Sequence, residues 1–144
     1  MEQFLLFLQK NPMNMVLFGT VLVTGGMLVW PLIARVMRPG LEVGTIEAVQ
    51  LINRRDAVVL DVRDAKEYKS GHITNARNVP EGEIEARMKE LDKFKSKPII
   101  VSCARGNRSM NVAKRLRALG FTEVVSLRGG IAAWEQANIP LEKS

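Results

Sequence analysis

The chain has 144 residues, of which 47% are hydrophobic and 25% are charged, a composition typical of a globular protein. Its single cysteine excludes an internal disulfide, and with a single histidine the chain has no Cys/His cluster for zinc. A disulfide-stapled secreted domain and a zinc enzyme are therefore not expected, and the sequence predicts neither a metal site nor a resident cofactor.

The net charge of +6 is distributed unevenly along the chain. Glu2 and Lys10 are the charged residues of positions 1–34, so the basic excess lies entirely in positions 35–144. We therefore expect an N-terminal anchor at residues 1–36, a linker at 37–43 and a domain at 44–144.

The uncharged run at residues 11–34 predicts a membrane-spanning helix, with the span itself at about residues 13–34. As a helix the run would extend about 36 Å, enough for a hydrocarbon core of about 30 Å. Lys10 stands alone before it, whereas Arg35 and Arg38 follow at once. The positive-inside rule then predicts a single-pass protein of the bacterial inner membrane, with its N-terminus outside and its C-terminal domain in the cytoplasm.

Two alternatives to the anchor fit the sequence less well. A cleaved signal peptide would have a basic start and a small-x-small cleavage site, but the chain has Glu2 near its start and the run ends in Ile33-Ala34-Arg35. A buried soluble helix that is apolar on all sides would need a larger core than this chain offers.

Residues 44–144 alternate between helical and strand patterns. Helices are expected at residues 46–53 (capped by Thr45), 65–68, 83–91, 107–119 and 132–136. Strands are expected at residues 57–60, 77–79, 98–101 and 123–127. Continuous apolar strands are typical of parallel sheets buried on both faces. The pattern predicts an α/β fold: an open, mainly parallel sheet flanked by helices, preceded by one transmembrane helix.

Two of these strands are followed by chemically useful residues, Asp61 and Cys103. Open α/β sheets bind ligands at the carboxyl ends of their strands. The loop after Cys103 leads into a helix, so its backbone N–H groups and the helix N-terminus favour an anion there. With Arg105 and Arg108 nearby, Cys103 is expected to ionise near neutral pH. A buried structural cysteine beside a solvated basic helix is the alternative that the loop alone leaves open.

Three stretches resemble the rhodanese family of sulfurtransferases in their order and spacing. They are residues 60–80, residues 127–134 and the loop Cys103-Ala104-Arg105-Gly106-Asn107-Arg108-Ser109. Together they cover most of residues 43–140. An anchor followed by one such domain is similar to the membrane-attached, YibN-type members of this family in bacteria.

The resemblance implies a covalent mechanism in two steps. Cys103 would take a sulfane sulfur from thiosulfate, a small anionic donor, or from a persulfide, and would become a transient persulfide. The residues implied to bind the donor and the transferred sulfur are Ala104, Arg105, Gly106, Asn107, Arg108 and Ser109. An external thiol, a protein or cyanide would then accept the sulfur, because the chain has no second cysteine.

Five further residues are expected to support this loop: Asp61, Arg63, Glu67, Gly129 and Gly130. Asp61 and Arg63 are expected to hold the neighbouring turns and to form a pair with Glu67. The two glycines are expected to be required by backbone geometry rather than by a ligand. His72 is interpreted as a histidine that stabilises a turn, and not as a catalytic base.

Two other functions stay open. The chain could be a tethered rhodanese module that mainly binds membrane proteins, or an oxyanion reductase or phosphatase. Cys103 and Arg108 enclose four residues, whereas the related phosphatases and arsenate reductases have a loop one residue longer. The expected partners are the lipid bilayer, through residues 13–34, and membrane proteins. Nucleic acid is not an expected partner, because no aromatic residues are interleaved with the basic ones.

Overall fold

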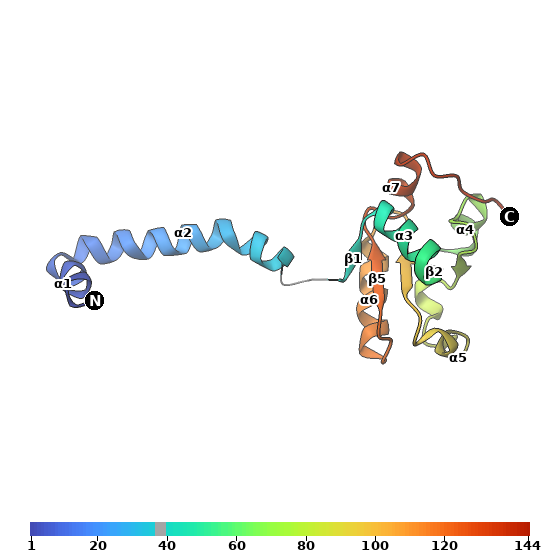
Figure 1. The fold of residues 1–144 in the computed structure, drawn as a ribbon, viewed down its shortest axis with the longest axis horizontal. Helices are drawn as coiled ribbons and strands as arrows, with labels where there is room; N and C mark the ends of the chain where they lie inside the picture. The colour runs from blue at the N-terminus through green and yellow to red at the C-terminus, as the bar shows by residue number, and fades with distance from the viewer. Residues whose placement is uncertain (37–39) are drawn as a thin grey trace. The chain divides into compact units, whose positions relative to one another are not determined.

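The computed structural model describes residues 1–36 and 40–144, and it divides into two compact units, Met1–Pro39 and Gly40–Ser144. The first unit consists of α1 (Glu2–Lys10) and α2 (Pro12–Val36) (Figure 1). The ring of Phe4 meets the ring of Phe18 edge to face at 5.5 Å. The Asn14 amide donates a hydrogen bond of 3.0 Å to the Phe7 carbonyl. The short helix α1, which the sequence did not predict, therefore packs against the beginning of α2.

Helix α2 contains the stretch Pro12–Ile33, which is long and apolar enough to cross a membrane and has no buried residues in its most apolar window. A signal sequence would satisfy the same criterion. The hydroxyls of Thr20 and Thr24 donate to the carbonyls of Leu17 and Thr20, at 2.8 and 2.7 Å. These polar groups are thus satisfied within the helix, as an apolar surrounding requires.

The second unit is built around a five-stranded sheet in the order β1-β5-β4-β2-β3, and all neighbouring strands pair in parallel. The strands are β1 (Glu42–Val43), β2 (Val58–Asp61), β3 (Arg77–Asn78), β4 (Ile99–Ser102) and β5 (Val124–Leu127). Asp61, the last residue of β2, lies opposite Ser102, the last residue of β4. The predicted open parallel sheet is therefore confirmed, and the Asp61 and Cys103 positions are brought to the same edge.

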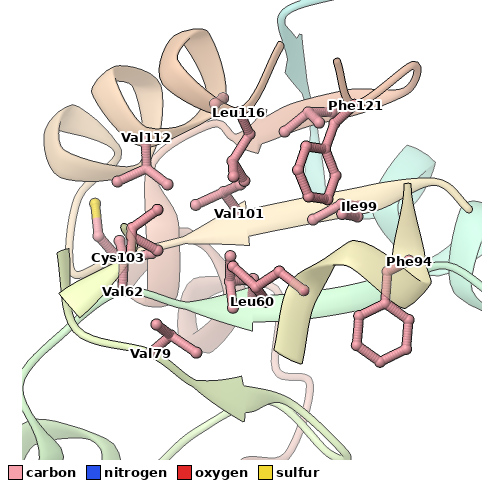
Figure 2. Packing of buried hydrophobic residues seen from close by; sticks show 14 residues of the cluster. Leu60, Val62, Val79, Phe94, Ile99, Val101, Cys103, Val112, Leu116 and Phe121 are labelled. Carbon is pink, nitrogen blue, oxygen red and sulfur yellow. The ribbon is translucent and has the colours of Figure 1, made fainter. Parts of the chain in front are cut away.

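Helices cover both faces of this sheet (Figure 1). They are α3 (Thr45–Arg55), α4 (Ala65–Ser70), α5 (Met88–Leu91), α6 (Asn107–Ala118) and α7 (Gly130–Gln136), with 3-10 turns η1 (Glu81–Glu83) and η2 (Asp92–Phe94). On one face Leu60 and Val101 pack with Leu116 of α6, as Figure 2 shows. On the other face Ile100 belongs to a second cluster with Trp134 of α7. Successive strand residues thus alternate between two cores, which explains why the strands are apolar throughout.

Further differences from the sequence prediction lie in the second unit. Gly44, not Thr45, is the N-cap of α3, and no side chain caps this end. The single helix expected at 83–91 is interrupted, because the segment buries Ile84 while Arg87 donates a hydrogen bond to the Asn78 carbonyl. Residues 42–43, expected in the linker, form the edge strand β1; the linker residues 37–39 lie outside the described residues.

Candidate active site

Cys103 lies directly after β4, at the carboxyl end of the sheet, and α6 begins four residues later at Asn107. Its side chain lies at one end of the core cluster shown in Figure 2, and only 1% of the residue is exposed. The cysteine therefore sits at the base of the loop, where the chain passes from a buried strand to a helix. This position unites the two features that the sequence suggested, a strand end and a helix start.

Two neighbours hydrogen-bond the Cys103 sulfur. The Gly106 backbone N–H donates to Sγ at 3.0 Å, and Sγ lies 3.4 Å from the Ser109 hydroxyl oxygen. Burial raises the pKa of Cys103, but the Ser109 hydroxyl and the backbone N–H groups of Ser109, Gly106 and Arg105 outweigh it, so the pKa lies below its ordinary value. The loop thus stabilises the thiolate, the nucleophilic form of the side chain.

Ser126 of β5 is a site residue that the sequence analysis missed. Its hydroxyl lies 2.7 Å from the Ser109 hydroxyl, and both residues are buried. The Gly106 carbonyl lies 3.0 Å from the Ser109 hydroxyl oxygen and is the alternative acceptor to Sγ for its single proton. The signal in the sequence was a lone serine among the apolar residues of β5. In the structure Ser126 fixes the position of the Ser109 hydroxyl, which faces Cys103.

The start of α7 holds the loop backbone. Ile131 N–H donates to the Cys103 carbonyl at 2.9 Å, and Ala132 N–H donates to the Ala104 carbonyl at 3.2 Å. Gly129 and Gly130 have φ angles of +74° and +59°, and a Cβ on Gly129 would lie 2.7 Å from the Ala133 Cβ of α7. A Cβ on Gly130 would lie 2.3 Å from the Cys103 carbonyl oxygen. The positive φ angles and the crowded Cβ positions give a backbone reason for glycine at both positions.

Glu67 of α4 forms an ion pair with Arg108 at the end of the loop, with Nη1–Oε1 and Nη2–Oε2 distances of 3.2 Å each. The expected pair of Glu67 with Arg63 is not formed. Arg63 instead donates to both carboxylate oxygens of Asp61, the shortest bond being 2.7 Å, and to the Gly71 carbonyl. The reason is burial. The carboxylate of Asp61 is fully buried and pairs with the Arg63 guanidinium, so the Glu67 carboxylate is left to pair with Arg108.

The remaining loop residues, Arg105 and Asn107, are exposed. Ala104 and Arg105 form part of the wall of a shallow pocket of about 260 Å³, whose other walls include Ile131, Glu135 and Leu141. An opening thus lies directly beside the cysteine loop. Within residues 1–36 and 40–144, no group of three or more His, Cys, Asp or Glu side chains is placed to hold a metal ion.

His72 is buried and lies outside the loop. Its ring stacks on Tyr68 at 3.8 Å, and Nδ1 lies 2.9 Å from the Tyr68 carbonyl. Its backbone also pairs with Glu142, which ties the C-terminal segment to the turn after α4. These contacts are structural ones.

The fold and the loop together define an α/β domain with a buried cysteine of lowered pKa at the carboxyl end of a central parallel strand. The model of the rhodanese-like domain family matches residues 45–137. The chain therefore belongs to the rhodanese-like domain family.

Similar proteins agree with this assignment. The chain is 41% identical over 96 residues to YibN of Escherichia coli strain K12, covering 66% of this chain and 67% of YibN. It is 37% identical over 94 residues to a protein named thiosulfate sulfurtransferase GlpE from Coxiella burnetii, covering 65% of this chain and 86% of GlpE. A crystal structure of a rhodanese-related protein from Thermoplasma volcanium superposes with a TM-score of 0.66 at 31% identity, covering 72% of this chain and 99% of that protein.

Proposed function

We propose that the protein is a membrane-anchored sulfurtransferase that moves a sulfane sulfur from thiosulfate or a persulfide donor to an external thiol, protein or cyanide acceptor. The observation that carries this proposal is the cysteine loop, in which Gly106 N–H contacts Sγ and the pKa of Cys103 is lowered. The relatives named thiosulfate sulfurtransferase support the same chemistry.

The first step is an attack of the Cys103 thiolate on the outer sulfur of the donor. With thiosulfate, the new S–S bond forms as the old one breaks, sulfite leaves with the electron pair, and a deprotonated persulfide remains on Cys103. The loop N–H groups that now surround Sγ, including that of Gly106, would stabilise the negative charge on the terminal sulfur. Arg105 and Arg108 would attract the anionic donor.

The second step needs an acceptor from outside, because Cys103 is the only cysteine of the chain. The acceptor thiolate attacks the terminal sulfur, and Cys103 leaves as a thiolate ready for the next donor. The pocket beside Ala104 and Arg105 offers room for an approaching acceptor. No resident cofactor takes part in either step as proposed.

Intact mass spectrometry of the purified full chain, in detergent and without reductant, tests the chemistry. After exposure to thiosulfate or to an alkyl persulfide we expect a gain of one sulfur atom, its loss on adding cyanide, and no gain in Cys103→Ser. A folded protein with reduced Cys103 that gains no sulfur from either donor contradicts the proposal and favours the tethered module that binds membrane proteins.

The membrane part of the proposal has its own support and test. The apolar stretch Pro12–Ile33 is followed by Arg35 and Arg38, which favours a cytoplasmic C-terminal domain. We expect the full chain to stay in the membrane pellet after alkaline carbonate extraction, and its C-terminal domain to resist protease added to intact spheroplasts. Release by carbonate contradicts the anchor, whereas digestion from outside contradicts the orientation alone.

A further inference from the structure

The ion pair between Glu67 and Arg108 changes the charge of the loop mouth. Both carboxylate oxygens engage the guanidinium, and the two side chains are 38% and 35% exposed, so the pair lies at the surface of the site. Arg108 lowers the pKa of Glu67, so the carboxylate is ionised at neutral pH. The positive charge of the Arg108 guanidinium is therefore partly compensated by Glu67 before any donor arrives.

Other carboxylates reduce the positive charge further. Asp61 takes up the charge of Arg63 in a buried pair. Glu67 raises the pKa of Arg108, and the thiolate of Cys103 and the carboxylate of Asp64 raise it as well, which shows that these groups lie within electrostatic reach of one another. Exposed Arg105 is in none of these pairs, so the loop keeps only part of the positive charge of its two arginines.

We infer that the negative charge of Glu67 makes Cys103 react faster with a persulfide than with a dianionic donor such as thiosulfate. The sulfane sulfur of a persulfide carries at most one negative charge. The inference rests on the proposed sulfurtransferase function and deepens it. A dianion that approaches Arg108 must come close to the Glu67 carboxylate and to the Cys103 thiolate together. The repulsion between these like charges acts over several ångströms and is screened only in part at a half-exposed site.

The persulfide reaction avoids this accumulation of charge. The Cys103 thiolate attacks the terminal sulfur of R–S–SH, the R–S to sulfur bond breaks, and RS⁻ leaves with the electron pair. The proton stays on the transferred sulfur and is released to solvent afterwards. The reacting pair carries one negative charge with a protonated persulfide and two with an ionised one, whereas thiolate plus thiosulfate carries three.

The test measures the second-order rate constants with which thiosulfate and a low-mass alkyl persulfide load sulfur onto Cys103 in the full chain. Glu67→Gln removes the charge and keeps the size of the side chain. We expect it to raise the thiosulfate-to-persulfide ratio of these constants about tenfold at low ionic strength, and we expect the increase to shrink when the salt is raised to about 0.5 M.

Two variants separate charge from positioning. Glu67→Asp keeps the charge, and we expect its ratio to stay near that of the wild type even if its absolute rates fall. Glu123→Gln removes a carboxylate from a similar two-point pair with Arg55. Glu123 directly precedes β5, so this pair lies at the amino end of the strands, opposite to the cysteine loop. We expect no change of the ratio in that control.

The outcomes are distinct. If Glu67 only positions Arg108, Glu67→Gln and Glu67→Asp slow both donors alike and the ratio does not move, which overturns the inference. A lower ratio in Glu67→Gln overturns it as well. If the wild type gains sulfur from neither donor, the proposed function itself fails. Should Glu67→Gln not fold, Glu67→Ser gives the same comparison with a smaller neutral side chain.

Discussion

Replacing Gly130 by alanine tests how the start of α7 shapes the cysteine loop. The φ angle of Gly130 is +59°, a conformation that costs an alanine about 1–2 kcal/mol. The new Cβ would lie 2.3 Å from the Cys103 carbonyl oxygen and 2.8 Å from the carbonyl carbon and oxygen of Ala104. These are backbone atoms that no side-chain rotation can move, so relieving the overlap costs a further ~1–3 kcal/mol.

We therefore expect Gly130→Ala to lower the free energy of unfolding by about 2–5 kcal/mol and, because the loop must shift by roughly 1 Å, to slow sulfur loading about 100-fold. Urea titration followed by Trp134 fluorescence, in a Trp30→Phe background, measures the first quantity, and intact mass after thiosulfate measures the second. Gly82→Ala is the matched control, since no atom lies within 4 Å of its Cβ position.

The opposite result is a free energy of unfolding for Gly130→Ala within about 1 kcal/mol of that for Gly82→Ala, together with the same rate of sulfur loading. It would refute this explanation, because the start of α7 would then tolerate a side chain against the loop. A loss of stability without slower loading would show that the loop recovers its shape after the backbone moves.

Two further changes test the hydrogen bonds around the site. Ser109→Ala removes a group that lowers the pKa of Cys103, so the pH midpoint of alkylation by iodoacetamide should move upward toward that of an ordinary thiol; an unchanged or lower midpoint contradicts this role. Asp61→Ala leaves the Arg63 guanidinium buried without its carboxylate and should lower the free energy of unfolding by about 3–5 kcal/mol in urea. Glu123→Ala, at an exposed pair, should lower the free energy of unfolding much less than Asp61→Ala, and equal losses in the two variants would contradict this expectation.

The chain order of helices and strands could be predicted because the patterns that carry it are local. The apolar runs before Asp61 and Cys103 predict buried parallel strands, and the structure places both residues at the carboxyl edge of the sheet. Short elements were less visible. Strand β1 has two residues, too few for a pattern, and the segment at 83–91 has helical spacing but follows its contacts with the core.

The candidate nucleophile, the family and the apolar stretch that could serve as an anchor can be recognised from residue types and their spacing along the chain. Which charges meet depends instead on the folded arrangement of distant segments. Glu67 is four residues from Arg63 but pairs with Arg108, and the Ser109 hydroxyl meets Ser126 of another strand. The physical reason is that the electrostatics and hydrogen bonds of the cysteine loop arise from segments distant in sequence, which the parallel sheet brings to one edge.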